Sequence, residues 1–123
     1  MSVYAFNDNL EKVPIVIARL SLQKSCAAGE ITTFEWNTQA LTAAGITASD
    51  LPYCEIIGIS WGLGSNPEYW YSNYDSVLTS VGVATGYPYA QIDTYLDKVV
   101  AGFYNNNSSA QAVTMRVTLM KVA

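Results

Sequence analysis

The sequence predicts an all-β domain with antiparallel strands and at most one short helix. Two stretches, 15–24 and 113–122, alternate between apolar and polar residues, which is the period of a strand with one solvent-facing side. Clusters of small and polar residues separate the apolar stretches and predict turns. With 123 residues, half of them apolar, the chain is long enough to bury a core as a single domain.

The first predicted strand, 15–24, follows an N-terminal arm. Residues 1–14 mix aromatic and polar side chains, and we expect this arm to dock through Tyr4 and Phe6, leaving 15–123 as the single domain. The apolar face of the strand carries Val16, Ala18, Leu20 and Leu22, and the polar face carries Arg19, Ser21 and Gln23. Small residues at 26–30 predict a turn, and the β-branched and aromatic residues at 31–36 predict the returning strand of a hairpin.

One short helix and one central strand are predicted next. Asn37 or Thr38 can cap a helical turn that carries Leu41 and ends at Gly45. In 53–61, apolar residues occupy both odd and even positions. This pattern predicts a strand that is buried on both faces and lies centrally in a sheet.

The rest of the chain predicts a loop-rich region and a terminal hairpin. Glycines and prolines recur from 62 to 88, so we expect loops there around one short strand at 77–83. Residues 94–104 fit a helix through the four-residue spacing of large side chains, or a strand through their β-branched and aromatic content. The strand is favoured because a polar turn at 105–109 and the alternating stretch 113–122 follow, which together predict a hairpin.

Composition and charge restrict the partners. Only 13% of the residues are charged, against about a quarter in a typical soluble domain, so part of the surface is predicted to be covered by other copies of the chain. The net charge of −4, without a cluster of basic residues, has the wrong sign for a nucleic-acid partner. No apolar run reaches the length of about 20 residues that spans a bilayer, and the N-terminus lacks the order of a signal peptide. We therefore expect no membrane partner and synthesis in the cytoplasm.

No catalytic constellation stands out. Without any histidine, catalysis would have to use carboxylates, lysine or cysteine. A carboxylate pair of the glycosidase kind is conceivable, but acidic residues that alternate with apolar ones are more typical of solvated strand faces. Cys26 and Cys54 lie far apart in no metal-like spacing, which predicts buried free thiols rather than a disulfide or ligand pair. We predict no enzyme activity, no cofactor and no metal.

Aromatic residues are concentrated in and beside the glycine-rich region, and this cluster is the most distinctive feature of the sequence. Six of them fall within 22 residues: Tyr53, Trp61, Tyr69, Trp70, Tyr71 and Tyr74. Rings with neighbouring polar side chains can stack on sugars and bond their hydroxyls, so a candidate ligand site comprises Trp61, Tyr69, Trp70, Tyr71, Asn73 and Asp75. Tyrosine and tryptophan are equally favoured in cores and subunit contacts, and this second interpretation is preferred.

Five segments, taken in order, carry a resemblance to a known family. They are 20–22, the turn 27–30, 55–60, the polar run 105–109 and the valine-threonine strand 113–119. In this order they resemble the small all-β head and fibre domains of tailed-bacteriophage virion proteins. The resemblance implies a β-sandwich of jelly-roll type, usually trimeric, that is displayed on the virion as a tail-fibre tip, head fibre or capsid decoration. It also implies contact with the capsid or with host surface glycans.

The favoured hypothesis is therefore a non-catalytic virion structural protein that self-assembles, as a homotrimer, and displays a binding surface for host attachment. A lectin-like carbohydrate-binding module is the alternative, and it requires the aromatic rings to be exposed together on one rim. An enzyme that uses carboxylates would require two acidic side chains to converge in a cleft. The environment of Trp61 and Trp70 distinguishes the first two hypotheses, since subunit burial favours assembly and an exposed patch favours sugar binding.

Overall fold

The computed structural model describes residues 3–6, 12–72, 76–79 and 82–122. In this part of the chain, eight strands, one α-helix and one 3-10 helix follow one another. They are β1 (Val3–Phe6), β2 (Lys12–Cys26), β3 (Ile31–Trp36), α1 (Thr38–Ala43), η1 (Ala48–Tyr53), β4 (Cys54–Leu63), β5 (Ser76–Thr79), β6 (Gly82–Asp93), β7 (Lys98–Asn105) and β8 (Gln111–Val122).

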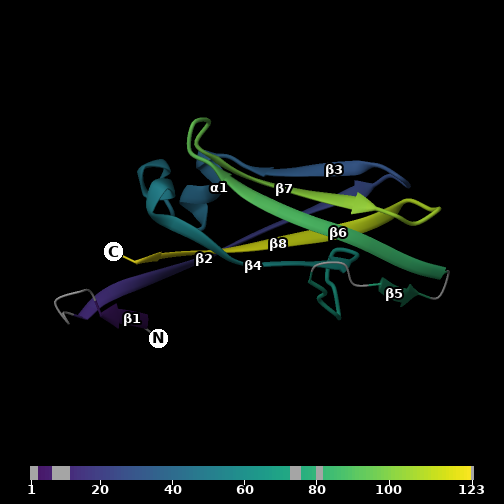
Figure 1. The fold of residues 1–123 in the computed structure, drawn as a ribbon, viewed down its shortest axis with the longest axis horizontal. Helices are drawn as coiled ribbons and strands as arrows, with labels where there is room; N and C mark the ends of the chain where they lie inside the picture. The colour runs from purple at the N-terminus through teal and green to yellow at the C-terminus, as the bar shows by residue number, and fades with distance from the viewer. Residues whose placement is uncertain (1–2, 7–11, 73–75, 80–81, 123) are drawn as a thin grey trace.

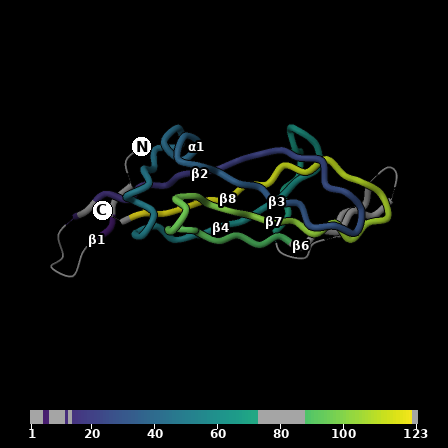
Figure 2. The backbone as a smooth tube through the Cα atoms, turned by 90° about the horizontal axis from the view of Figure 1, so that it is seen from above, coloured from purple at the N-terminus to yellow at the C-terminus, as the bar shows by residue number. Residues whose placement is uncertain are grey.

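The strands form two antiparallel sheets that pack face to face. One sheet has the order β1-β2-β8-β4 and the other β3-β7-β6-β5. Figure 1 shows the two layers, with α1 at one end, and Figure 2 shows the elongated outline from above. The predicted all-β sandwich with one short helix is confirmed.

The chain crosses between the sheets at two neighbouring turns, so both predicted hairpins are wrong. β2 leads into β3 of the other sheet, and β7 leads back into β8 of the first. The amide of Gly29 donates to the Asn105 carbonyl at 2.8 Å, and the Asn105 amide donates to the Glu30 carbonyl at 3.1 Å. The two turns therefore hold each other while β2 pairs with β8 and β3 with β7, a wrapping of the jelly-roll kind.

The inner faces of the two sheets form one core. Strand β8 contributes Val113, Met115, Val117 and Leu119, all with no exposed surface, which confirms its predicted apolar face. Ala18 and Leu20 of β2 meet them from the adjacent strand, and Phe34, Val99 and Phe103 close the core from the opposite sheet. Burial of alternate residues on both layers is what stabilises a sandwich.

Strand β4 lies at the edge of its sheet, so its predicted central position is wrong. Its strand partner in the described part of the chain is β8, and the register between the two shifts between Ile56 and Gly58, as in a β-bulge. Before the shift Cys54 and Ile56 pack on the core, and after it Ile59 and Trp61 do. The bulge exchanges the two faces, which explains why apolar residues occupy both odd and even positions.

The region predicted as loops contains the long strand β6. The single strand predicted at 77–83 is divided between β5 and β6, and β6 continues through Gly86 and Pro88. Its pairing with β5 ends at Thr85, whereas its pairing with β7 begins at Gly86. In the described part of the chain Pro88 therefore has a strand neighbour on one side only, where a proline is tolerated in a sheet.

The two remaining local predictions are largely confirmed. Asn37 caps α1, since its side-chain oxygen accepts from the Ala40 amide at 3.0 Å, and Gly45 follows with a φ of 93°. Most of 94–104 belongs to strand β7, as favoured, but 94–97 form the turn between β6 and β7. The Asp93 carboxylate stabilises that turn, because its Oδ1 accepts hydrogen bonds from the backbone amides of Tyr95 and Leu96.

Candidate functional site

Trp61, one member of the predicted ligand site, lies in the core. It has no exposed surface, and its ring centroid is 4.9 Å from that of Phe103 on the opposite sheet. Tyr71 packs on it at 5.2 Å between ring centroids. The register shift between Ile56 and Gly58 turns Trp61 inward, so it joins the two sheets rather than offering a ring face to a sugar.

The segment after β4 folds back along the edge of that strand. Trp61 and Tyr71 exchange both backbone hydrogen bonds, each at 2.8 Å. A Cβ atom on Gly62 would collide with the ring of Pro67 and the carbonyl oxygen of Tyr69, so only glycine allows this close return. Tyr71, another residue of the predicted ligand site, is thereby half-buried and covers the core.

Two aromatic residues of the predicted site, Tyr69 and Trp70, remain at the surface, and an arginine packs on the Trp70 ring. The Arg116 guanidinium carbon lies 3.9 Å from the centroid of the half-buried Trp70 ring, a cation–π contact. Arg116 also donates from Nε to the Ser60 hydroxyl oxygen at 3.2 Å. Tyr69 is 65% exposed. Asn73 and Asp75, which complete the prediction, lie outside the described residues.

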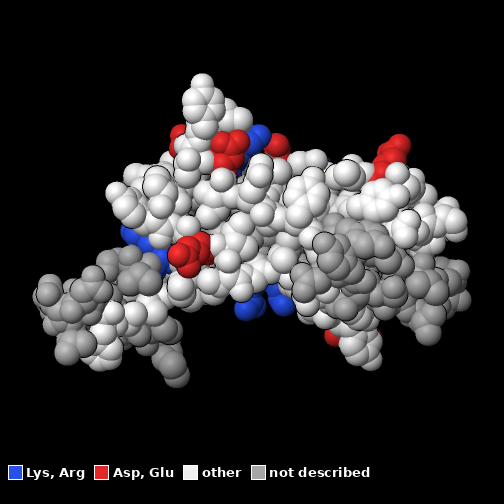
Figure 3. All heavy atoms as spheres, viewed as in Figure 1, with Lys and Arg blue, Asp and Glu red and all other residues white. Residues whose placement is uncertain are grey.

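A second arginine shares the outer face of this sheet. Arg19 of β2 lies opposite Thr118 of β8, which is two positions from Arg116. The two arginines are therefore diagonal neighbours, a position in which Cα atoms lie about 7–8 Å apart. Burial lowers the pKa of Arg116, and the charge of Arg19 lowers it further. Figure 3 shows basic groups side by side on the lower surface, beneath the layer that contains β2, β8 and β4.

This arginine pair was missed by sequence reasoning, although part of the signal was present. The alternation of β2 placed Arg19 on a polar face, and the alternation of β8 did the same for Arg116. Both strands were expected in separate hairpins with other partners. Only the pairing of β2 with β8, which joins the two ends of the chain, brings the residues together.

The predicted docking residues Tyr4 and Phe6 belong to β1, which pairs with the start of β2 from Val3 opposite Ile15 to Phe6 opposite Lys12. Even-numbered residues of β2 face the core, so Phe6 lies on the core side of the sheet. Its side chain is nevertheless 71% exposed. Figure 1 shows why, since this hairpin extends past the end of the second sheet. The side chain of Tyr4 lies outside the described part.

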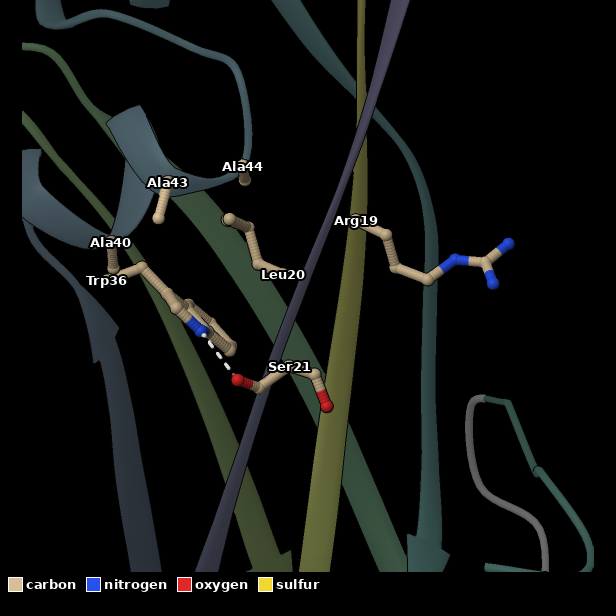
Figure 4. A pocket seen from close by; sticks show the side chains of 7 residues that line it. All are labelled: Arg19, Leu20, Ser21, Trp36, Ala40, Ala43 and Ala44. Carbon is tan, nitrogen blue, oxygen red and sulfur yellow. Dashed lines mark hydrogen bonds between the residues drawn. The ribbon is translucent and has the colours of Figure 1, made fainter. Parts of the chain in front are cut away.

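A shallow hollow lies between β2 and α1. Figure 4 shows Trp36 and Leu20 beside the helix, whereas the Arg19 side chain points to the other side of β2. The lining is completed by Ser21, Ala40, Ala43 and Ala44. The Trp36 indole donates a hydrogen bond to the Ser21 carbonyl at 3.2 Å. It thereby satisfies a backbone group on the edge of β2 that does not pair with β8. The lining is mostly apolar, with Arg19 and Ser21 as its polar members, and it includes no carboxylate or thiol.

The shorter of the two ion pairs in the described part of the chain lies near the C-terminal end of β8. Lys121 donates to Asp50 at 2.6 Å and, with the Thr47 amide and hydroxyl, lowers the pKa of Asp50 to about 2. Cys26 and Cys54 are free and buried, as predicted, and burial raises the pKa of each thiol. Within the described residues, no group of three acidic, cysteine or histidine side chains could hold a metal ion.

Comparison with known proteins adds no relative. No family model, no curated protein and no solved structure matches the chain. Among the residues that the structure describes, no helix is long and apolar enough to cross a membrane.

Proposed function

We propose that this protein is a non-catalytic structural subunit that self-associates through the β1–β2 hairpin, in the manner of a virion head fibre, decoration or tail-fibre protein. The observation that carries the proposal is the position of Phe6. It occupies the core side of a sheet at a point where no second sheet of the same chain covers it in the described structure.

An exposed phenylalanine in this position favours a second copy of the chain as its cover. The core side of the sheet continues from the buried Leu20 and Ala18 through the half-buried Val16 to the exposed hairpin, so a neighbour could extend the core without a change of fold. Burying a phenylalanine side chain stabilises by about 1.5–3 kcal/mol per chain. Closed symmetric oligomers repeat that contribution at each interface.

The composition supports the same occupant. Only 13% of the residues are charged, which is few for the whole surface of a monomer. Obligate interfaces are more apolar than ordinary surface, so a low charged fraction fits a chain that buries part of its surface against other copies. The trimeric state and the virion location are part of the proposal because the order of the sequence segments resembles that of phage fibre domains.

Light scattering of the purified chain across a dilution series tests self-association. We expect a closed oligomer, a trimer, that persists on dilution, and Phe6→Asp should dissociate it to monomers. Tyr95→Asp is the matched control, because Tyr95 is 91% exposed at the β6–β7 turn and should leave the mass unchanged.

A wild-type monomer at all concentrations would overturn self-association. An oligomer that Phe6→Asp leaves intact would overturn the role of the hairpin. Mass spectrometry of purified virions tests the location separately, and absence of the chain from particles that otherwise carry their full set of proteins would overturn the virion assignment.

A further inference from the structure

We propose that the outer face of the β1-β2-β8-β4 sheet binds a carboxylated sugar chain through Arg19 and Arg116. This inference goes beyond self-association and does not depend on it, since the hairpin residue Phe6 lies on the other side of the sheet. The two arginines are held on one face by the register of β2 with β8, so the site is built into the sheet rather than into a loop.

First, the two arginines form no ion pair with an acidic side chain in the described part of the chain, and Glu55, which shares their face, lies opposite Met120. The ion pairs in the described part of the chain join Lys98 with Glu35 and Lys121 with Asp50, at 2.9 and 2.6 Å. Neither arginine takes part in one there. The two arginines are diagonal neighbours across the β2–β8 pair, so an anion placed between them would relieve the repulsion of their charges.

The second step is that Arg116 is already oriented. Its guanidinium is stacked on Trp70, and its Nε is bonded to Ser60. Within the described residues these contacts do not use the two terminal amino groups, which form a planar fork, the geometry that binds the two oxygens of a carboxylate. Because the side chain is held before binding, less conformational entropy is lost when the anion arrives.

The third step concerns what surrounds the two guanidinium groups. Ser21 lies opposite Arg116 across the β2–β8 pair, and Thr118 lies opposite Arg19, so hydroxyl groups occupy the same face. Trp70, on which the Arg116 guanidinium lies, brings a half-buried aromatic ring to the same face. Two cations with hydroxyl groups and an aromatic ring beside them match a saccharide that carries carboxylates better than a neutral one.

The net charge of −4 argues for a local site rather than general attraction to polyanions. Calorimetry with pentagalacturonate at low salt tests the proposal, and its fully methyl-esterified form is the matched neutral ligand. We expect binding of the acid and no measurable binding of the ester. Arg19→Gln and Arg116→Gln should each weaken binding about tenfold or more, as loss of a charged hydrogen-bonding partner does.

Three controls separate the alternatives. Lys98→Gln removes the same charge from the other sheet and should leave affinity unchanged, and Arg116→Lys keeps the charge but loses the fork, so it should still weaken binding. Phe6→Asp should bind with unchanged affinity per chain, which keeps this test independent of self-association. The amide chemical shifts of each variant, measured by NMR, would confirm that it remains folded.

Several outcomes would overturn the proposal. Equal affinity for acid and ester would exclude a role for charge, and absence of binding to the acid would exclude the site. Acetate or inorganic sulfate binding as tightly as the saccharide would show a simple anion site without a sugar component. An effect of Lys98→Gln equal to that of the arginine variants would show general electrostatic attraction.

Discussion

The two faces of the β1-β2-β8-β4 sheet are built from alternate residues of the same strands and differ in exposure and charge. On the inner face, Leu20, Val117 and Leu119 are at most 2% exposed and touch the opposite sheet. On the outer face, one position away, Arg19 and Arg116 share the surface with hydroxyl side chains and with the exposed Ile17 and Ile57. The difference shows that the inner positions stabilise the fold, which leaves the outer positions available for recognition.

The largest expected effect lies where the opposite sheet meets the inner face. Phe103 is buried and packs on Trp61, so Phe103→Ala should leave a cavity between the layers and lower the free energy of unfolding by about 3–5 kcal/mol. Urea denaturation monitored by tryptophan fluorescence measures the loss. Thr118→Ala on the outer face is the control, and a comparable loss there would contradict the distinction between the faces.

The next effect concerns Asn105, which ties the two crossing turns together. Its buried side-chain amide donates to the carbonyls of Cys26 and Ser109, both at 3.0 Å, and its oxygen accepts from the Asn107 amide at 3.0 Å. Asn105→Ala should leave the buried Cys26 carbonyl without this donor, remove the bond to Ser109 and destabilise by about 1–3 kcal/mol.

The exposed neighbour Asn106 provides the matched control, since Asn106→Ala should change the midpoint of urea unfolding little. Equal effects of the two substitutions would show that the turn tolerates loss of the buried amide. In that case the crossing between the sheets would depend on the backbone bonds alone.

Strands were predictable from the sequence, but their partners were not. Alternation in 15–24 and 113–122 correctly indicated two strands and their buried faces, because side-chain period is a local property. The turns at 26–30 and 105–109 look like hairpin turns, and only contacts between them reveal that both cross the sandwich. Pairing across about ninety residues carries no local signal.

The candidate site was predictable to a similar degree. The aromatic cluster around 61–71 was noticed, but the bulge between Ile56 and Gly58 decides which of its rings enters the core. Bulges depend on the partner strand, so Trp61 could not be separated from Trp70 by sequence alone. The arginine pair required the β2–β8 register, which is also a long-range property.

The inner face of β8 ends in a charge, and this predicts a pH effect. Lys121 follows Leu119 on the core-facing positions and bonds Asp50, whose pKa is lowered to about 2. A lowered folded-state pKa means that the stabilisation is complete above the ordinary value of 3.8 and is lost as pH falls toward about 2. Asp50→Asn lacks this contribution, so its melting temperature should approach that of the wild type over this interval.

Thermal melts followed by circular dichroism across that interval provide the measurement. Lys121→Met supplies a second variant, because loss of the cation should raise the pKa of Asp50 and move the acid-dependent loss to higher pH. A constant difference between wild type and Asp50→Asn across the interval would show that the carboxylate gains nothing from its partners in the folded state.

The smallest expected effect returns to the outer face and tests whether it is free of a structural role. Arg19 has no ion pair in the described part of the chain, and its charge opposes that of Arg116. Arg19→Gln should therefore change the free energy of unfolding by no more than about 0.5 kcal/mol, or raise it. Arg116→Gln loses the contact with Trp70 and should cost about 0.5–1 kcal/mol. A loss above about 1 kcal/mol for Arg19→Gln in urea denaturation would show that this arginine stabilises the sheet. The contrast between a face for folding and a face for recognition would then fail at the residue on which it most depends.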